Sequence, residues 1–547
     1  MIIIGATHPI SYNNAACLLI NGRLIAFAEE ERFTRLKHAP RVYPHRAIDF
    51  CLRYAGLKPQ DVNATAVGFD PPGLTDLTTE TIARYIAGTL PASEVGALHV
   101  HAAHLSTETD IQPYGALYHY DHHLAHAASA FAPSGFDEAN VITLDGWGGR
   151  LSGLFGFQRR GRSLELIHEV GPQNSWGVVY GLVTQQLGFR FHSAEGKTMG
   201  LAPYGVPDEQ LLPDWCDETF GLPDANRYQD YLVNSIAKRD PREPLAEYHK
   251  NLAATLQHYY ERSLLKIARH LYARTSSRNF VLAGGVALNC TGNGKLAAQD
   301  FVDGLFIQPA SHDAGTALGA AILAHEQLTG RSCAIDFDHA YWGPDYSDDD
   351  IRGALRFAQV NYREVDPAEA AASAILENKV IGWFQGRAEV GPRALGARSI
   401  LANPTDGGNL DRVNLRVKRR EPWRPLAPSV LEERFFDLFD MRVLSPFMLI
   451  AGEVRNEWRA KLPAVVHVDG SARPQSVSPK PNPLYHRLLT TLQTRAGIPA
   501  VLNTSFNLDD EPLVNSPEHA IASFFRSGLD ALVIGNFMVE KAPSTSR

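Results

Sequence analysis

Short apolar runs alternate with amphipathic segments through the first part of the chain. Runs of three or four apolar residues that end near a polar residue or a glycine are typical of buried strands, and they occupy residues 2–4, 141–144 and 280–283. Two further runs flank Asn21-Gly22, a dipeptide that favours a two-residue β-hairpin turn. The pattern therefore predicts several strands, two of which form a hairpin.

Segments with helical spacing separate these strands. Residues 46–57 carry apolar side chains at helical positions and reach Gly56, which suits a helix C-cap. Residues 312–328 predict another helix, with Asp313 near its start and small residues that permit close packing. Strands that alternate with helices indicate an α/β fold, in which ligands bind at the carboxyl ends of the strands. No internal repeat is evident in the sequence.

A change of character divides the chain into two predicted domains, residues 1–345 and 346–547. Gly343, Pro344 and an acidic helix start at Ser347 mark the boundary. Beyond it, arginine-rich, loop-like segments are spread over about 200 residues, which is a normal domain size. A chain of 547 residues also exceeds what one core usually holds.

Composition narrows the class of protein. The chain is 44% hydrophobic and 20% charged with a net charge of −8, which argues against a nucleic-acid partner. Five cysteines without a CxxC spacing favour a reducing compartment and argue against a cysteine-based zinc site. The first residues lack a signal-peptide pattern, and no run approaches the roughly 20 apolar residues that span a bilayer. We therefore expect a cytoplasmic protein with no membrane segment.

Three histidines lie within five residues in "YDHHLAHAASAF". On a helix, His122 and His126 share one face, with their β-carbons about 5–6 Å apart. That spacing suits two imidazoles on one metal, although the Glu of the HExxH zincins is absent. Ordinary packed histidines are the alternative, and we expect the adjacent His123 to be structural.

Two aspartates strengthen the metal hypothesis. Asp145 follows a buried strand at a Gly-rich turn, and Asp313 opens a helix beside a Ser-His pair. Two His and two Asp suit a borderline divalent ion such as Fe²⁺, Mn²⁺ or Zn²⁺. Helix capping and turn formation remain alternative roles for the aspartates.

Other segments supply groups that bind anions. The turns "DGWGG" and "GGVALN" lie at strand ends and suggest a nucleotide cleft, although tight packing also explains glycines. Arginine and lysine in Gly/Pro-rich loops suit phosphate or carboxylate oxygens, whereas Arg419 and Arg420 of "KRRE" are better interpreted as solvated surface charges. The loop cations are Arg387, Arg393, Arg398, Lys418, Arg424 and Arg473. "NTSFN", which contains Ser505, follows a predicted strand and is consistent with oxyanion contacts or with a simple turn.

Together these segments resemble one family, the O-carbamoyltransferases that include nodulation protein U and antibiotic-tailoring enzymes. The matching stretches span nearly the whole chain: "AEEERFTRLKH", "HHLAHAASAF", "LDGWGG", "EGKTMGLAPYG", "LAGGVALNCTGNGKL", "GRAEVGPRALGARSI", "NLRVKRREPWRPLAPS", "RPQSV" and "NTSFN". The resemblance implies an N-terminal actin/hexokinase-like (RNase H-like) domain, similar to the tRNA threonylcarbamoyl transferases, and a C-terminal YrdC-like α/β domain.

The resemblance also implies the chemistry. The second domain would make carbamoyl-adenylate from carbamoyl phosphate and ATP with Mg²⁺, and the first would transfer the carbamoyl group to a hydroxyl of a small natural product. The implied metal, typically Fe(II), would be held by His122, His126, Asp145 and Asp313. Carbamoyl phosphate would be held by Arg393, Lys418, Arg473 and Ser505, with Arg387, Arg398 and Arg424 nearby. The nucleotide would lie near Gly146, Lys197, Gly284, Gly285 and Asn289.

The chain departs from the family at the residue that would deprotonate the acceptor. Family members carry a His-Asp pair before the second strand, where this chain has Tyr12-Asn13-Asn14. A general base contributes roughly 10²–10⁴-fold, so we expect one. His8 is our candidate, with capping of the loop as its alternative role and Tyr12 as a substitute.

Two other functions compete. A tRNA-directed carbamoyl-type transferase is disfavoured by the net charge of −8. A non-catalytic actin-fold nucleotide-binding protein would need neither the HxxxH spacing nor the arginines of the second domain. The sequence leaves the acceptor, the native metal and the oligomeric state open, a homodimer included.

Overall fold

The structure is a computed structural model that describes residues 1–69 and 111–541. It divides into two compact units. The N-terminal unit comprises Met1–Glu30 and His38–Phe337, and the C-terminal unit comprises Glu31–Lys37 and Asp338–Arg547. This division differs in two respects from the predicted boundary after residue 345, because it falls at residue 337 and because a short N-terminal segment belongs to the C-terminal unit.

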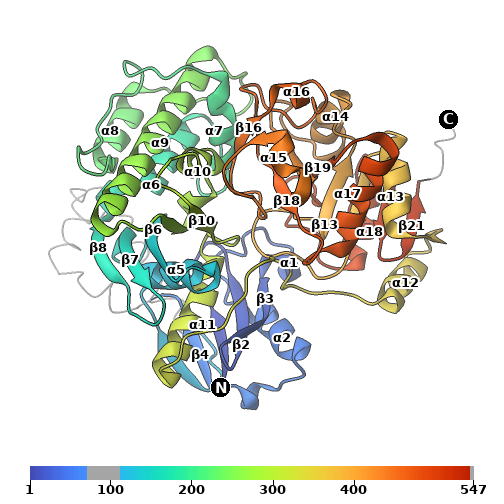
Figure 1. Cartoon of the computed structure of the whole chain (residues 1–547), viewed down its shortest axis with the longest axis horizontal. Helices are drawn as coiled ribbons and strands as arrows, with labels where there is room; N and C mark the ends of the chain where they lie inside the picture. Colours follow the sequence, from blue (N-terminus) through green and yellow to red (C-terminus); the bar gives the residue numbers. More distant parts are fainter. Residues whose placement is uncertain (70–110, 542–547) are drawn as a thin grey trace. The chain divides into compact units, whose positions relative to one another are not determined.

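Two five-stranded sheets with the same strand order form the frame of the N-terminal unit (Figure 1). The first sheet has the order β3-β2-β1-β4-β5, with bounds β1 (Ile2–Ala6), β2 (Ala15–Ile20), β3 (Arg23–Glu29), β4 (Ala64–Val67) and β5 (Ala116–His119). The second has the order β10-β9-β6-β7-β8, with bounds β6 (Glu138–Gly148), β7 (Leu151–Arg159), β8 (Glu165–Val170), β9 (Asn279–Ala283) and β10 (Gly304–Ile307). In each sheet the first three strands are antiparallel and the last two are parallel to the first. This repeat leaves no recognisable trace in the sequence.

The predicted hairpin and helices are confirmed. β2 and β3 are joined by Asn21 and Gly22, whose φ angles of 50° and 76° are both positive, as the favoured two-residue turn requires. The helices of this unit are α2 (His45–Tyr54), α5 (His122–Phe131), α6 (Trp176–Gln186), α7 (Glu195–Leu201), α8 (Ala225–Ser235), α9 (Glu247–Thr275), α10 (Cys290–Ala297) and α11 (Ala314–Thr329). The α/β class predicted from the sequence is therefore confirmed.

Helices α5 and α11 connect the two sheets. α11 packs on β1, β2 and β4 of the first sheet, α5 packs on β6 and β9 of the second, and the two helices pack against each other. The contact is close because Gly319 has no side chain: a β-carbon there would lie 1.7 Å from the carbonyl oxygen of Ala125. The amino-terminal ends of both helices are thereby brought to one place.

The strand β6 extends further than predicted. It runs through Asp145 to Gly148, but its pairing with β7 is broken between Leu144 and Gly148. Asp145 therefore lies in an irregular stretch within a strand rather than in a turn after it. Such irregularities redirect side chains.

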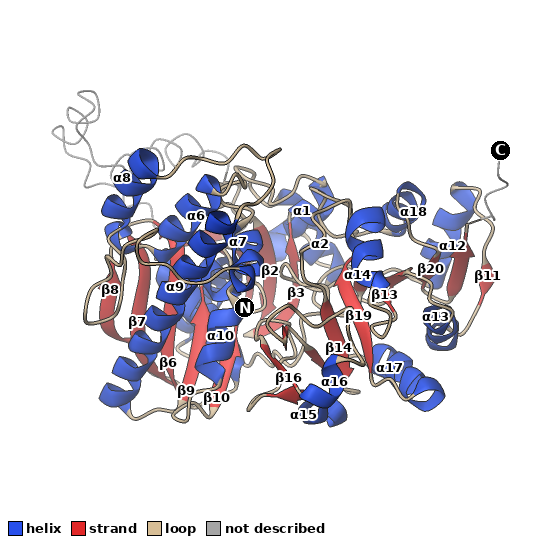
Figure 2. Ribbon diagram, turned by 90° about the horizontal axis from the view of Figure 1, so that it is seen from above, coloured by secondary structure: helices blue, strands red, loops and turns tan. Residues whose placement is uncertain are grey.

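A mixed sheet of eight strands forms the core of the C-terminal unit, with helices on both faces (Figure 2). The order is β11-β21-β20-β12-β13-β19-β14-β18, with bounds β11 (Arg363–Glu364), β12 (Ile381–Phe384), β13 (Arg398–Ala402), β14 (Ala427–Leu431), β18 (Gln475–Val477), β19 (Ala500–Ser505), β20 (Ala531–Ile534) and β21 (Phe537–Glu540). A small sheet holds β15 (Phe439–Asp440), β16 (Gly452–Val454) and β17 (Ser471–Ala472).

Two apolar clusters pack against this sheet. One involves α12 (Asp348–Phe357) and α18 (Pro517–Arg526), and the other α13 (Pro367–Leu376) and α17 (Pro483–Ala496). Ser347 caps α12 as predicted, because its hydroxyl accepts the Asp350 N–H while the Asp350 carboxylate accepts the Ser347 N–H. The other α-helices described between residues 338 and 541 are the single turns α14 (Gly408–Asp411), α15 (Phe435–Leu438) and α16 (Asn456–Arg459).

The segment Glu31–Lys37, which includes the short helix α1 (Glu31–Thr34), is fastened within the C-terminal unit by arginines. The buried Arg32 donates to the carbonyl of Gly391 at 2.8 Å. Arg35 donates to the carbonyls of Pro512 and Leu513. Since β3 ends at Glu29, the chain passes directly from a strand of one unit into the other. Among the described residues, no helix is both long and apolar enough to cross a bilayer.

We predict that Gly319→Ala destabilises the N-terminal unit. Alanine is favoured over glycine by about 1 kcal/mol inside a helix, but the new β-carbon meets a backbone carbonyl that cannot rotate away. Overpacking should prevail and lower the free energy of unfolding by about 2 kcal/mol or more. Urea denaturation of the purified protein measures the change.

Gly353→Ala is the matched control. Gly353 also lies inside a helix, α12, but a β-carbon there meets nothing within 4 Å. This substitution should stabilise by about 0.5–1 kcal/mol. Equal effects of the two substitutions would show that the α5–α11 contact is not close.

Candidate functional site

Four side chains from three elements converge in the N-terminal unit. His122 and His126 lie on the first turns of α5, Asp145 on the irregular stretch of β6, and Asp313 immediately before α11. One potential ligand atom of each residue lies within 4.8 Å of those of the other three. The spacing that predicted a shared face for the two histidines thus leads to a single site, which we call the His/Asp cage.

The distances within the cage fit a bound cation. The Nε2 atoms of His122 and His126 are 3.1 Å apart, and Nε2 of His126 is 3.2 Å from Oδ2 of Asp145. Nε2 of His122 is 3.9 Å from Oδ1 of Asp313. Ligands held about 2.0–2.2 Å from a metal lie about 3–3.5 Å apart, so small adjustments would seat an ion here. The donor set suits Fe²⁺, Mn²⁺ or Zn²⁺.

Neighbouring backbone groups orient the cage. Nδ1 of His122 lies 3.3 Å from the carbonyl of Gly68, a contact that leaves Nε2 to face the cage. The carboxylate of Asp145 accepts the N–H groups of Gly146 at 2.6 Å and Gly285 at 3.1 Å. Gly148 is required beside them, because a β-carbon there would lie 1.9 Å from the His122 ring.

Asp313 does not cap its helix, although capping was the alternative interpretation of this residue. Its side chain makes no capping hydrogen bond to α11. Instead, Oδ2 accepts the backbone N–H of Tyr12 at 2.8 Å, from the loop that follows β1. The carboxylate therefore belongs to the cage and is also held by Tyr12, which lies at the position where the family carries its His-Asp pair.

The two imidazoles keep the carboxylate of Asp145 negatively charged. Burial alone would raise the pKa of Asp145, but the facing imidazoles of His122 and His126 outweigh it and hold the pKa well below its usual range. A carboxylate that stays ionised between two imidazoles is a ready ligand. His123 stands apart, since its ring nitrogens lie 3.2 Å from Oγ1 of Thr143 and 3.1 Å from the carbonyl of Leu151.

Of the residues predicted to bind the nucleotide, Gly146 and Gly285 lie beside the cage, where both donate to Asp145. Gly284 has a φ of 88° and a β-carbon there would meet the Leu144 carbonyl at 2.1 Å, so only glycine fits. Gly285 donates to Asp145, as described above. Asn289 uses its side chain to cap α10, accepting the Gly292 N–H at 2.9 Å. Lys197 projects from α7 and lies over the Phe189 ring, 5.6 Å from its centroid.

The two sequence candidates for the base differ in their surroundings. His8 is fully buried, its Nδ1 accepts the Ile10 N–H at 3.1 Å, and its ring lies 5.2 Å from that of Phe69. These contacts fit the loop-capping alternative. Tyr12 lies between the rings of His38 and His192, at 4.8 and 5.6 Å. His192 is a neighbour of the cage that the sequence interpretation missed, because it is an isolated histidine with no telling spacing.

A second site lies in the C-terminal unit, around Lys418. Its ammonium is buried and donates to the Ser505 hydroxyl at 3.0 Å and to the Asn507 side chain at 2.5 Å. Burial and the nearby Arg420 and Arg424 lower the pKa of Lys418 well below its usual value. The structure thus brings Lys418 and Ser505 together, as expected.

Arg420 belongs to this site, which corrects the sequence interpretation. It was assigned with Arg419 to the solvated surface, yet it is half-buried and donates to Asn414 at 2.8 Å, whereas Arg419 is exposed. Burial and the charge of Arg424 lower the pKa of Arg420 to about 9, and Arg473 acts in the same direction. We call Lys418, Arg420, Arg424 and Arg473 the basic cluster.

Two of the predicted arginines hold loops instead. Arg398 is fully buried, donates to the carbonyls of Gln385 and Pro344, and stacks 3.7 Å above the Phe384 ring. Arg387 donates to the carbonyls of Gly343 and Trp342. Arg393 lies half-buried on the loop before β13, next to Ala394, whose carbonyl accepts from Asn503 of β19 at 3.1 Å.

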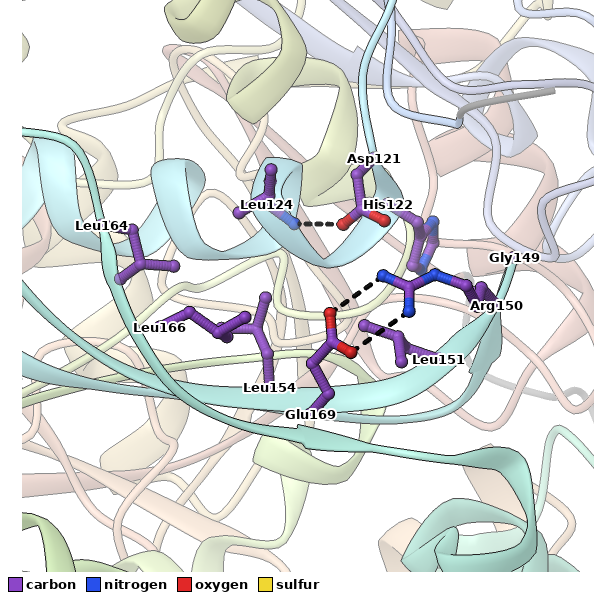
Figure 3. A pocket seen from close by; sticks show the side chains of 11 residues that line it. Asp121, His122, Leu124, Gly149, Arg150, Leu151, Leu154, Leu164, Leu166 and Glu169 are labelled. Carbon is purple, nitrogen blue, oxygen red and sulfur yellow. Dashed lines mark hydrogen bonds and ion pairs between the residues drawn. The ribbon is translucent and has the colours of Figure 1, made fainter. Parts of the chain in front are cut away.

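An apolar pocket of about 290 Å³ adjoins the cage at His122 (Figure 3). The leucines in its lining are Leu124, Leu151, Leu154, Leu164 and Leu166. Arg150 and Glu169 also line it and pair through two hydrogen bonds of 3.1 and 2.9 Å. An apolar cavity therefore lies next to the cage on the side of α5.

Comparisons with known proteins match both parts of the chain to one family. The family models described as the carbamoyltransferase N-terminus and C-terminus match residues 3–322 and 372–541. Nodulation protein NolNO of Sinorhizobium fredii is 38% identical over 545 residues, covering 97% of this chain and 79% of that protein. The 3'-hydroxymethylcephem-O-carbamoyltransferase of Amycolatopsis lactamdurans is 29% identical over 448 residues, covering 77% of this chain and 80% of that enzyme.

Among solved structures, HypF of T. kodakarensis aligns with 60% of this chain and 48% of its own, at 15% identity and a TM-score of 0.34. The two family models together extend over most of the chain, and both the His/Asp cage and the basic cluster lie within the matched residues. The chain therefore belongs to the carbamoyltransferase family.

Proposed function

We propose that this protein is an ATP-dependent O-carbamoyltransferase for a small hydroxylated molecule. In the C-terminal unit, water cleaves carbamoyl phosphate into carbamate and inorganic phosphate. The carbamate oxygen then attacks the α-phosphorus of ATP, and pyrophosphate leaves. In the N-terminal unit, the resulting carbamoyl-adenylate gives its carbamoyl group to a hydroxyl, and AMP leaves. The basic cluster carries this proposal, together with the family membership.

The basic cluster needs an anion. Lys418 is 4% exposed, and Arg420, Arg424 and Arg473 are all close enough to act on one another or on Lys418 electrostatically. Glu421 offsets part of this charge, since its carboxylate lies 3.6 Å from the Arg424 guanidinium. The other like charges are desolvated together, which favours a bound anion. Carbamoyl phosphate is a compact dianion, and guanidinium groups suit its oxygens. The same charges would stabilise the departing phosphate.

The His/Asp cage would hold a divalent metal through His122, His126, Asp145 and Asp313. When bound, such an ion supplies a Lewis acid that polarises the carbamoyl-adenylate or fixes its orientation. The surrounding residues position the cage carboxylates. Gly284 and Gly285 have no side chains and let their backbone pass close to Leu144 and Asp145, and the backbone N–H of Tyr12 holds Asp313.

The competing functions lack such support. For a tRNA-directed transferase, a net charge of −8 offers no general attraction to a polyanion. A protein that only binds a nucleotide has no use for the basic cluster. We also propose a cytoplasmic location, since the five cysteines are all free.

The first prediction concerns the reaction. Incubation with ATP, Mg²⁺, carbamoyl phosphate and a panel of hydroxylated metabolites, hydroxymethylcephems and sugars included, should yield one product that is heavier by one carbamoyl group. Mass spectrometry detects the product, and omission of ATP is the control. A product that forms equally without ATP would contradict the adenylate route.

The second prediction concerns the basic cluster. Arg473→Ala should lower carbamoyl-phosphate-dependent pyrophosphate release by about 10²–10³-fold, because a charge that faces the departing phosphate is lost. Arg419→Ala, which removes an exposed arginine beside the cluster, should have little effect. Near-normal turnover of Arg473→Ala, with its circular dichroism unchanged, would place the anion elsewhere.

The third prediction concerns anion binding without turnover. Carbamoyl phosphate at about 100 times its dissociation constant should stabilise the protein by about 2.7 kcal/mol, which thermal denaturation records as a rise in Tm. Arg473→Ala should abolish this rise, and Arg419→Ala should preserve it. A rise that survives in both variants would separate the binding site from the basic cluster.

The fourth prediction concerns the cage. Purified protein should contain about one transition metal per chain, and changing both His122 and His126 to Ala should remove it, because two of four ligands are lost. His258→Ala, at an exposed histidine on α9, is the control. Elemental analysis gives the metal content, and an unchanged content in the double variant would refute the ligand assignment.

A further inference from the structure

Transfer to a hydroxyl requires a base that removes its proton, and this chain has no histidine at positions 12–14, where the family carries one. This requirement rests on the proposed function, because it concerns the transfer of the carbamoyl group to the acceptor. His8, the nearest histidine in sequence, is fully buried and its Nδ1 already accepts the Ile10 N–H. Another titratable side chain near the cage is therefore needed.

His192 is such a side chain. It lies between α6 and α7, and its φ of 62° places it in the left-handed region that residues other than glycine rarely adopt. Its backbone N–H donates to Oε1 of Glu195 at 2.8 Å, which holds this conformation. Backbone strain of this kind costs of order 1–3 kcal/mol and gathers at functional sites.

The imidazole of His192 lies near Gly146, which follows the cage residue Asp145. A β-carbon built on Gly146, the neighbour of Asp145, would lie 3.8 Å from Cε1 of His192. The ring contacts those of Phe191 and Tyr12, with centroids 4.0 and 5.6 Å away. Since the Tyr12 N–H also holds Asp313, a single loop connects His192 with a cage carboxylate.

The ring nitrogens of His192 are available. The residue is exposed, and within the part of the chain that the structure describes neither ring nitrogen makes a hydrogen bond. Partial desolvation lowers its pKa below the ordinary value, against the opposing charges of Asp145 and Asp313. The ring is therefore neutral at neutral pH and able to accept a proton.

We propose that His192 is the general base of the transfer step. The acceptor oxygen forms a bond to the carbamoyl carbon, and the hydroxyl proton passes to an imidazole nitrogen of His192. The bond between the carbamoyl carbon and the adenylate oxygen breaks, and AMP leaves with the electron pair. The exposed position of His192 lets an acceptor arrive from solvent, which the buried His8 does not.

Tyr12 serves a different purpose in this arrangement. Burial raises the pKa of its phenol, with Arg190 and Ser193 opposing, so that the hydroxyl keeps its proton at neutral pH. A protonated phenol is a poor base. Tyr12 acts instead as a positioning residue, with its ring between His38 and His192 and its backbone N–H on Asp313.

The test compares two nucleophiles that differ in their need for a base. With ATP, Mg²⁺ and carbamoyl phosphate, hydroxylamine traps the activated carbamoyl group as hydroxyurea without help, whereas methanol must lose its proton during attack to give methyl carbamate. His192→Gln should lower methyl carbamate formation by about 10²–10⁴-fold and leave hydroxyurea formation within about twofold of the wild type. Imidazole added to His192→Ala should restore part of the methanol reaction, a rescue that a purely structural role would not allow.

Three controls define the outcomes. His258→Gln should match the wild type with both nucleophiles. Absence of hydroxyurea from the wild type would refute the proposed function, whatever His192 does. Hydroxyurea formation with an unchanged methanol rate in His192→Gln, or without any methyl carbamate from the wild type, would overturn the role of His192. If methyl carbamate formation falls in His8→Gln but not in His192→Gln, His8 is the general base.

Discussion

The close contact of α5 with α11 is the constraint on which the N-terminal site depends. Each helix follows the last strand of one sheet, and the two sheets share one strand order. The repeat therefore sets equivalent helices against each other, and the missing side chain of Gly319 lets their backbones meet. His122 and His126 begin one helix and Asp313 precedes the other, so the contact that joins the sheets also builds the cage.

The candidate sites of the two units suit ligands of opposite charge. In the N-terminal unit two carboxylates and two imidazoles converge, which is stable with a cation between them. In the C-terminal unit Lys418 and three arginines converge, which is stable with an anion. Burying either set without its ligand is unfavourable. The first site therefore suits a cation and the second an anion.

Local patterns in the sequence were sufficient for much of this picture. The Asn21-Gly22 hairpin, the capped start of α12 and the shared face of His122 and His126 each follow from neighbours within a few residues. Longer-range features could not be predicted in this way. Arg420 was misjudged because its burial depends on how its loop packs, and the segment Glu31–Lys37 gives no sign that it joins the C-terminal unit.

The repeat also bears on the proposed role of His192 as the general base. His8 follows β1 much as Asp145 follows the regular part of β6, so the two occupy comparable places in the two sheets. His8 is fully buried, whereas Gly146 lies in the break of the β6 pairing and a β-carbon there would be 3.8 Å from Cε1 of His192. The loop after β1 still orients Asp313, because the bond is donated by the backbone N–H of Tyr12. Any residue other than proline could donate it. A side chain at positions 12–14 can therefore change without loss of the cage, and in our proposal the imidazole of His192 supplies the base from another element.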